Sequence, residues 1–273
     1  MTASGSTRID GRAADEVRPV KITRHYTKYA EGSVLVETGE TQVLVNVSVE
    51  TGVPRWLRGT GRGWVTAEYN MLPRATQQRN MREVNRGKPS GRTQEIQRLV
   101  GRCLRSVVEL DRLGENTLWV DCDVIQADGG TRTASITGAF VALVDALYHQ
   151  MKREHLRYLP LNNSVAAISC GIVGGVPILD LAYEEDSRAQ VDLNVVGTGT
   201  GGLVEIQGGA EKDPFSWKQL DVLTGLARSG LEDMTQAQKE ALGPLWDEVR
   251  AGVARLGENA PFGALRDLKG DLP

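Results

Sequence analysis

The glycine pair Gly129-Gly130 constrains the fold most, because it joins two long segments of different periodicity. Residues 117–126 alternate between apolar and polar side chains, which predicts a strand with one buried face. Residues 131–155 carry apolar side chains at helical spacing, which predicts a long helix with one buried stripe. Glycine tolerates the positive φ angles of a tight turn. We therefore expect a strand that turns directly into a helix at this point.

Further elements are predicted before this unit. Residues 20–50 are rich in β-branched side chains and are broken at Gly39, which predicts a hairpin. Residues 63–72 predict another strand, and residues 93–110 predict a helix with an apolar face. The polar, arginine-rich residues 74–91 between them predict a long loop. Loops of this length inside a domain tend to be functional.

The second half repeats the order of strands followed by helices. Four strands are predicted, at residues 164–173, 176–183, 190–197 and 202–207. Ser216–Gln219 and Thr235–Gln238 each fit a capping box, so we expect one helix from each, the second broken at Gly243-Pro244. Residues 245–256 predict a last helix. This order predicts an α/β (α+β) protein of two related sub-domains.

The pattern also suggests where the parts of the chain begin and end. Residues 1–15 are expected to form a loose N-terminal tail. The two sub-domains are assigned to residues 16–158 and 159–240. Residues 241–273 form a C-terminal extension, which we expect to be a surface appendage.

The composition is that of a soluble globular protein, with 40% hydrophobic and 25% charged residues. No apolar run approaches the roughly 20 residues that a membrane helix needs, and Met1–Asp10 lacks the apolar core of a secretory signal. The cysteines are widely spaced and form no pair suited to a disulfide framework or a zinc site. We expect Cys103, Cys122 and Cys170 to be free and buried, and the protein to be cytoplasmic.

Positive charge is concentrated in one segment. Between Arg55 and Arg105 there are twelve basic and three acidic residues, whereas the whole chain has a formal charge of −3. Nearly all the basic residues are arginines, whose planar guanidinium groups suit phosphate. A basic band on an otherwise acidic protein favours contact with a polyanion. The alternative is a solvated surface of salt bridges.

The residues that follow the glycine pair predict a phosphate site. Gly130, Thr131 and Arg132 begin the long helix, whose first N–H groups and positive dipole end favour an anion. An arginine in the first turn opposes the dipole, and a bound anion would offset that cost. Arg92 lies at a second helix start and could converge with Arg132. The alternative is a plain helix cap, and neither segment matches a nucleotide-binding glycine pattern.

Acidic residues gather in and before the strand at 190–197: Asp180, Glu184, Glu185, Asp186 and Asp192. Within the strand, Asp192 and Asn194 share the polar face, while Asp186 lies in the preceding turn. Carboxylates beside a phosphate site usually bind a hard cation such as Mg²⁺. The alternative is an edge of the sheet that faces solvent.

Four blocks in collinear order resemble the bacterial ribonuclease PH family. They are Gly63-Trp-Val-Thr-Ala-Glu-Tyr-Asn-Met-Leu-Pro-Arg74, Gly91-Arg-Thr-Gln-Glu-Ile-Gln-Arg-Leu99, Gln126-Ala-Asp-Gly-Gly-Thr-Arg-Thr-Ala-Ser-Ile-Thr-Gly138 and Glu185-Asp-Ser. The resemblance spans Arg8 to Gln238, and related chains include polynucleotide phosphorylase and exosome ring subunits. It implies two similar βαβ-type sub-domains of the RNase PH / ribosomal protein S5 domain 2-like fold, with one left-handed crossover. It also implies a homohexamer, a trimer of dimers.

The resemblance further implies a phosphate-dependent 3′→5′ exoribonuclease, a tRNA nucleotidyltransferase. Such an enzyme trims tRNA precursors beyond the CCA end, with rRNA ends as a further candidate substrate. It releases nucleoside diphosphates and runs in reverse with them. No DNA or membrane partner is implied.

Site residues carry over by motif as three sets. Inorganic phosphate, the co-substrate, would be bound by Arg92, Gly130, Thr131 and Arg132. The catalytic residues Asp186 and Asp192 would hold Mg²⁺ or assist the leaving 3′-oxygen. Contacts to tRNA and between subunits of the ring would come from Arg74, Arg79 and Arg82.

Two other functions are compatible with the same residues. One is an RNA-binding ring subunit without catalysis, and phosphate-dependent shortening of RNA would distinguish the enzyme from it. The other is a hydrolytic nuclease that uses the same carboxylates and releases nucleoside monophosphates.

Overall fold

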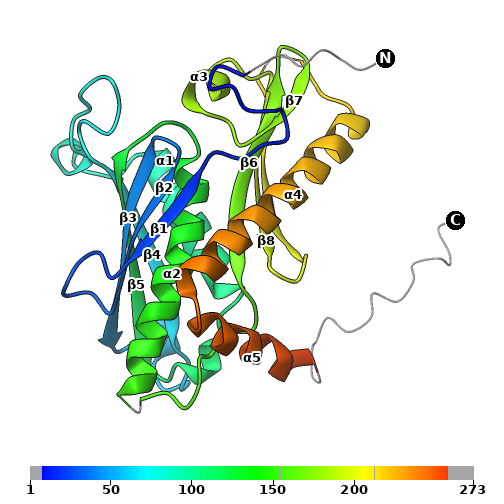
Figure 1. Cartoon of the computed structure of the whole chain (residues 1–273). Helices are drawn as coiled ribbons and strands as arrows, with labels where there is room; N and C mark the ends of the chain where they lie inside the picture. Colours follow the sequence, from blue (N-terminus) through cyan, green and yellow to red (C-terminus); the bar gives the residue numbers. More distant parts are fainter. Residues whose placement is uncertain (1–7, 154, 212, 258–273) are drawn as a thin grey trace, which may run out of the picture.

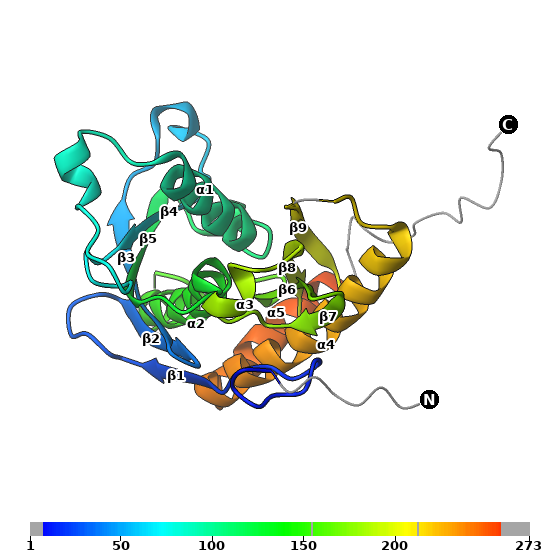
Figure 2. The same ribbon diagram turned by 90° about the horizontal axis from the view of Figure 1, so that it is seen from above.

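Two β-sheets, one from each half of the chain, lie on either side of the long helix α2, Thr131–Lys152 (Figures 1 and 2). The computed structural model describes residues 8–153, 155–211 and 213–257. Helix α2 packs on β2 and β3 of the first sheet and on β6 of the second. The predicted α/β fold of two related sub-domains is confirmed, while the hand of the predicted crossover stays a prediction.

The first sheet has the strand order β1-β2-β3-β5-β4. Its strands are β1 Val20–Arg24, β2 Gly32–Thr38, β3 Thr41–Thr51, β4 Trp64–Met71 and β5 Asn116–Gln126. Strands β4 and β5 are parallel and are joined through helix α1, Gly91–Arg105, whereas the other neighbours are antiparallel. Three short 3-10 helices lie in the connections, at Arg55–Leu57, Glu83–Arg86 and Leu110–Arg112. The segment predicted as a hairpin thus forms three strands.

The second sheet is antiparallel throughout, with the order β7-β6-β8-β9. Its strands are β6 Val165–Val173, β7 Val176–Leu179, β8 Val191–Thr198 and β9 Leu203–Ala210. A single helical turn, α3 Tyr183–Asp186, connects β7 to β8. Helix α4, Trp217–Leu242, covers the face of this sheet opposite α2, and α5, Leu245–Gly257, follows it (Figure 1).

Helix α2 is buried on every side, not on one stripe as predicted. Every residue from Thr133 to Leu147 is buried, because one sheet covers each side of the helix. Glycine makes the close contact possible: a Cβ at Gly32 of β2 would lie 1.9 Å from the carbonyl oxygen of Ala142. A Cβ at Gly138 would lie 2.7 Å from Val36. The packing fixes the N-terminal end of α2 relative to both sheets.

Helix α4 is one helix, so the second capping box was a wrong prediction. Thr235 lies in its middle and donates its hydroxyl to the carbonyl of Leu231. Gln238 is fully buried, and its amide nitrogen donates to the carbonyls of Thr137 and Val165, at 2.9 Å each. The capping-box pattern at Thr235 does not start a new helix, because a continuous helix keeps its apolar side packed on the second sheet.

Both ends of the described chain are more firmly packed than predicted. Arg8 and Arg12 are buried, so residues 8–15 are not a loose tail. Helix α5 confirms the predicted last helix, but its buried residues Leu245 and Val249 belong to the main core, so it is not a mere surface appendage. Residues 1–7 and the loose end predicted after α5 lie outside the described residues.

Two composition-based expectations can be compared with the structure. All three cysteines are free and buried, as predicted. Among the described helices, none combines the length and apolar character that crossing a bilayer requires.

Candidate functional site

A cavity of about 610 Å³ lies where the N-terminal ends of α1 and α2 meet the α3 turn and strand β8. Six residues predicted for phosphate binding and catalysis line it together: Arg92, Gly130, Thr131, Arg132, Asp186 and Asp192. They come from both halves of the chain, so the site exists only because the two sheets are packed together. The structure thus brings the residues predicted for phosphate binding and the predicted carboxylate pair into one cavity, while their roles stay predictions.

The glycine pair shapes the floor of this cavity. Gly129 and Gly130 both have positive φ angles, 78° and 67°. A Cβ at Gly129 would lie 2.5 Å from the carbonyl oxygen of Leu181, so the turn can touch the α3 loop only as glycine. Gly130 is the N-cap of α2 and offers no side-chain acceptor to the first N–H groups of the helix. The positive end of the α2 dipole thus faces the cavity, where an anion would be favoured.

Thr131 is held by a tyrosine that the sequence analysis did not single out. The hydroxyl groups of Tyr69 and Thr131 are 2.9 Å apart and share a hydrogen bond. Tyr69 is 1% exposed, and its burial raises the pKa of the phenol, so the neutral form persists. Strand β4 thereby fixes the first residue of α2 through a neutral hydrogen bond.

Arg132 contacts α1 and β9 from the first turn of α2. Its Nη1 donates to Gln207 Oε1 at 2.9 Å and to Glu95 Oε1 at 3.3 Å. Gln207 in turn donates to Glu95 at 2.6 Å. Both bonds of Arg132 engage a single nitrogen, and the side chain is 17% exposed. Its fork is therefore oriented by these partners and retains donors for a phosphate oxygen in the cavity.

Arg92 lies in the first turn of α1, as predicted. The hydroxyl of Ser90 caps this helix by accepting from the N–H of Thr93 at 3.1 Å. Thr93 also donates its hydroxyl to Glu83 at 2.8 Å. These contacts hold the helix start, and the exposed Arg92 lines the cavity from it.

Asp186 and Asp192 face the two arginines across the cavity. Burial raises the pKa of Asp186, and the negative charge of Asp192 raises it further. Arg92 and Arg132 act in the opposite direction on the same group. These four charges therefore interact with one another within a single site.

The carboxylate pair is chemically suited to a divalent cation. Mg²⁺ is usually held by one or two carboxylates and completes its shell with water and substrate phosphates. In the part of the chain that the structure describes, no group of three or more His, Cys, Asp or Glu side chains could hold a metal. Asp186 and Asp192 fit a cation shared with a bound phosphate rather than one enclosed by protein.

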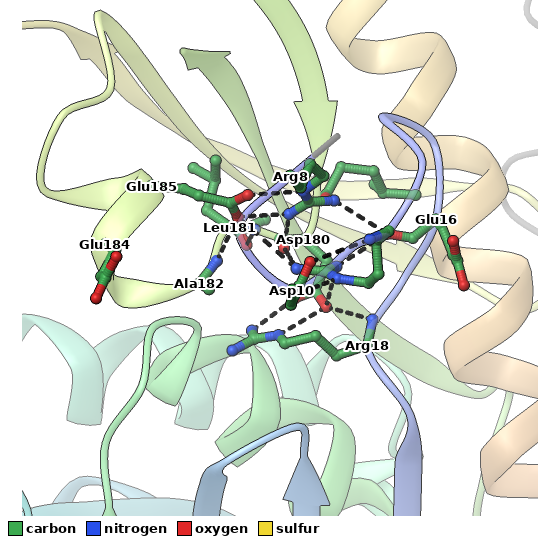
Figure 3. A network of polar contacts seen from close by, with 12 residues as sticks. Arg8, Asp10, Glu16, Arg18, Asp180, Leu181, Ala182, Glu184 and Glu185 are labelled. Atoms are coloured by element: carbon green, nitrogen blue, oxygen red, sulfur yellow. Dashed lines mark hydrogen bonds and ion pairs between the residues drawn. The ribbon is translucent and has the colours of Figure 1, made fainter. Parts of the chain in front are cut away.

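Two of the other acidic residues form buried ion pairs and do not face the cavity. Asp180 and Glu185 are buried and are bound by arginines of the N-terminal segment (Figure 3). Glu184 is exposed on α3 and does not line the cavity. The acidic cluster seen in the sequence thus divides into carboxylates that face the site and carboxylates that do not.

Arg74, Arg79 and Arg82 are exposed and lie outside the cavity lining. The same loop contributes Thr76, Gln77 and Gln78 to the lining, which the sequence analysis did not predict. Part of the basic band is salt-bridged surface, as the alternative interpretation proposed. Arg62 pairs with Asp111 at 2.6 Å and Arg102 pairs with Glu205 at 2.5 Å.

Several residues of the site were missed: Tyr69, Glu95, Asp128, Ser169 and Gln207. Tyr69, Glu95 and Asp128 lie inside the blocks that carry the resemblance, which offered a signal for them, whereas Ser169 and Gln207 lie in ordinary strands with no such signal. Asn194 was noted only for sharing a strand face with Asp192, and that shared face does line the cavity. Because side chains two positions apart point to the same face of a strand, Asn194 could have been predicted from Asp192.

Comparison with protein families gives the class to which this fold and site belong. Residues 16–148 match the model of the 3′ exoribonuclease family, domain 1, and residues 163–230 match domain 2 of the same family. The two matches follow each other in order along most of the chain. The chain therefore belongs to the 3′ exoribonuclease family, also called the RNase PH family.

Solved structures with the same fold include chains of archaeal exosomes. A chain of the Archaeoglobus fulgidus exosome with RNA bound to the active site is 26% identical, with a TM-score of 0.72, over 85% of this chain and 92% of that one. A chain of an archaeal exosome core is 26% identical, with a TM-score of 0.68, over 85% and 91%. Rice (Oryza sativa) Rrp46 is 20% identical, with a TM-score of 0.70, over 86% and 100%, and shows the shared fold alone.

Proposed function

We propose that this protein is a phosphate-dependent 3′→5′ exoribonuclease of the bacterial ribonuclease PH type. The observation that carries the proposal is the convergence of Arg92, Arg132 and the start of α2 with two carboxylates in one cavity. Family membership supplies the class of reaction. The residues in the cavity favour inorganic phosphate as the attacking group, because they form an anion site beside the carboxylates.

The proposed reaction joins phosphate to the last nucleotide of an RNA. An oxygen of inorganic phosphate attacks the terminal phosphodiester phosphorus, and the bond from that phosphorus to the 3′-oxygen of the preceding nucleotide breaks. The products are a nucleoside diphosphate and an RNA one residue shorter, whose 3′-oxygen takes up a proton. One phosphoanhydride forms as one diester breaks, so the reaction also runs in reverse.

The N-terminal ends of two helices and two arginines act on the negative charge in this reaction. Arg92 and the first N–H groups of α2 bind and orient the attacking phosphate. Arg132, oriented by Glu95 and Gln207, stabilises charge on the two phosphoryl groups in the transition state. Catalysis is then positioning and electrostatics rather than covalent chemistry.

Asp186 and Asp192 are proposed as the catalytic residues. A carboxyl with a raised pKa, as at Asp186, is suited to pass a proton to the leaving 3′-oxygen. In the alternative role, the ionised pair would be the ligands of Mg²⁺, which when bound would supply positive charge to the phosphoryl oxygens. Dependence of activity on added Mg²⁺ at fixed pH distinguishes the two roles.

The direct test is phosphate dependence. Purified protein is incubated with a tRNA precursor that carries extra 3′ residues, with and without inorganic phosphate, and the released nucleotides are identified. Nucleoside diphosphates that appear only with phosphate are the expected result. Equal shortening without phosphate, or release of nucleoside monophosphates, would indicate a hydrolytic nuclease. No shortening under either condition would favour a non-catalytic RNA-binding subunit.

The substrates are proposed to be tRNA precursors, with rRNA ends as a second candidate, in a cytoplasmic homohexamer. The similarity to exosome chains supports a ring assembly. Arg74, Arg79 and Arg82, exposed beside the cavity, are proposed to contact tRNA or a neighbouring subunit.

Arg74→Ala should therefore change the sedimentation coefficient or weaken tRNA binding, because it removes a charge from that surface. Sedimentation velocity and a tRNA-binding titration measure the two effects. A hexamer with unchanged tRNA affinity would contradict the role of Arg74.

A further inference from the structure

The N-terminal segment Arg8–Arg18 packs against the loop that carries α3 and reaches the turn before α2 through Arg18. In Figure 1 this dark blue segment lies beside α3 and β7, and the backbone N–H of Leu179 donates to the carbonyl of Ala14 at 2.8 Å. One wall of the cavity carries Asp186 on the α3 turn, and the other carries the glycine pair and Arg132. Arginines of the segment reach toward both walls, although none of them lines the cavity.

Arg8 binds the α3 turn through a two-point ion pair. Its Nε and Nη2 donate to the two carboxylate oxygens of Glu185 at 2.7 and 2.5 Å. Glu185 also accepts from the backbone N–H of Ala182 at 2.9 Å, which closes the start of the turn (Figure 3). Arg8 further donates to the carbonyls of Leu179 and Asp180, at 2.7 Å each. Arg8 therefore holds both Glu185, the residue directly before Asp186, and the loop that leads into the α3 turn.

Arg18 connects the other side of the same loop to the glycine pair. Its Nε and Nη2 donate to the carboxylate of Asp180 at 2.9 and 2.7 Å. Its Nη1 donates to the carbonyl of Asp128, the residue before Gly129, at 2.5 Å. A Cβ placed at Gly130 would lie 3.0 Å from Nη2 of Arg18, so the guanidinium touches the turn itself.

The environment of Arg18 keeps this connection charged and rigid. Burial alone would lower the pKa of the Arg18 guanidinium, but the hydrogen bond and charge of Asp180 raise it above its usual value. Arg12 donates to the same carboxylate at 3.3 Å and to the Asp180 carbonyl at 3.1 Å. Bidentate arginine–carboxylate pairs fix orientation as well as distance.

We propose that Arg8 and Arg18 are positioning residues for the reaction, which set the place of Asp186 relative to the phosphate site at Gly130 and Arg132. Arg8 acts on the carboxylate wall through Glu185. Arg18 acts on the phosphate wall through the Asp128 carbonyl. The inference rests on the proposed function, and it assigns separable effects to two residues outside the cavity.

The chain contains a matched control for general stability. Arg24 forms a similar ion pair with Asp145 of α2, with its Nε at 3.0 and 3.1 Å from the two carboxylate oxygens. Asp145 lies fourteen residues beyond Thr131, about 21 Å along α2 at 1.5 Å per residue. Neither Arg24 nor Asp145 lines the cavity. Loss of the Arg24–Asp145 ion pair should therefore weaken folding without moving either wall of the cavity.

The experiment compares Arg8→Lys, Arg18→Lys and Arg24→Lys in the full chain. Lysine keeps the charge but lacks the planar fork, so the variants are milder than alanine replacements. Thermal unfolding gives the stability of each variant, and kinetics are measured well below the lowest midpoint. The initial rate of nucleoside diphosphate release gives kcat and the phosphate KM, and calorimetric titration with inorganic phosphate alone gives a Kd.

For Arg8→Lys we expect kcat to fall by about tenfold or more, because small misplacements of a catalytic group cost up to about a hundredfold. Its phosphate KM and Kd should change by less than about twofold, since the phosphate wall keeps its anchor. For Arg18→Lys the phosphate Kd should rise by about tenfold. Arg24→Lys should lower the unfolding midpoint with kcat, KM and Kd within about twofold of wild type.

Two results would overturn the inference. One is full kcat in Arg8→Lys together with an unchanged phosphate Kd in Arg18→Lys. The other is that all three variants lose activity and phosphate affinity in proportion to their lost stability, which would make the network purely structural. Failure of the proposed function is recognised separately, because wild-type protein would then release no nucleoside diphosphate. The phosphate titration still tests Arg18 in that case.

Discussion

Glu185 and Asp186 are neighbours in sequence, and their side chains have opposite environments. Burial alone would raise the pKa of Glu185, but the hydrogen bond from Arg8 lowers it below its usual value. Burial also raises the pKa of Asp186, and there Asp192 adds to the shift. Glu185 is buried against Arg8, whereas Asp186 is exposed in the cavity beside Asp192, so accessibility and charged partners together separate the carboxylate that holds the turn from the one that faces the cavity.

Asp186→Asn should show the largest effect, a fall in kcat of about a thousandfold, because it removes a proposed proton donor or metal ligand. RNA affinity and the unfolding midpoint should stay close to wild type. Rapid-quench or steady-state release of nucleoside diphosphates measures kcat, and a filter-binding titration measures RNA affinity. Glu184→Gln is the control, since this exposed carboxylate on the same turn lies outside the cavity. Loss of RNA binding in Asp186→Asn would mean that the residue is structural.

Glu185→Gln should lower the folding stability, which Asp186→Asn should leave close to that of wild type. Removing one partner of a buried ion pair leaves the other charge unpaired and costs about 3 kcal/mol of folding free energy. Urea unfolding of the variant and wild type at neutral pH measures the difference. A variant as stable as wild type would remove the contrast between the two neighbours.

Arg132→Ala tests the arginine side of the cavity. We expect kcat/KM for phosphate to fall by about a hundredfold, because a donor aimed at the transition-state charge is lost. Its contacts with Glu95 and Gln207 are partly exposed, so the unfolding free energy should change by about 1 kcal/mol or less. Rates measured over a range of phosphate concentrations test this, and an unchanged rate at low phosphate would rule out the role.

The smallest expected effect is the change in the free energy of unfolding with pH, and its direction differs between the buried and the cavity carboxylates. The pKa values of Asp180 and Glu185 are lowered, so their stabilisation is present above the unfolded-state pKa, about 4, and is lost as the pH falls through the folded values. The pKa of Asp186 is raised, so its contribution is present in acid and is lost as the pH rises through its folded value. Urea midpoints of wild type and Glu185→Gln between neutral pH and acid measure this. The curve for Glu185→Gln should be flatter below about pH 4, and parallel curves would contradict the assignment.

Local patterns in the sequence determined much of the first half of the fold. Gly129-Gly130 predicted the strand, turn and helix that the structure contains, because positive φ and periodicity are properties of short segments. The same reasoning predicted that Arg92 and Arg132 begin helices. It failed at Thr235, where a valid capping pattern lies inside α4 because the buried face of the helix continues past it.

The pairing of charges was decided by the tertiary structure. The sequence showed a run of acidic residues after Asp180 and arginines near the N-terminus, but not which would meet. Arg8 and Glu185 are separated by 177 positions, and only the packing of two sheets around α2 brings them into a bidentate contact. Helix and strand formation depend on near neighbours, whereas the pKa of a carboxylate depends on whichever charge lies within a few ångströms. The sequence by itself thus determined the elements and the candidate residues, and the fold decided which carboxylates face the cavity.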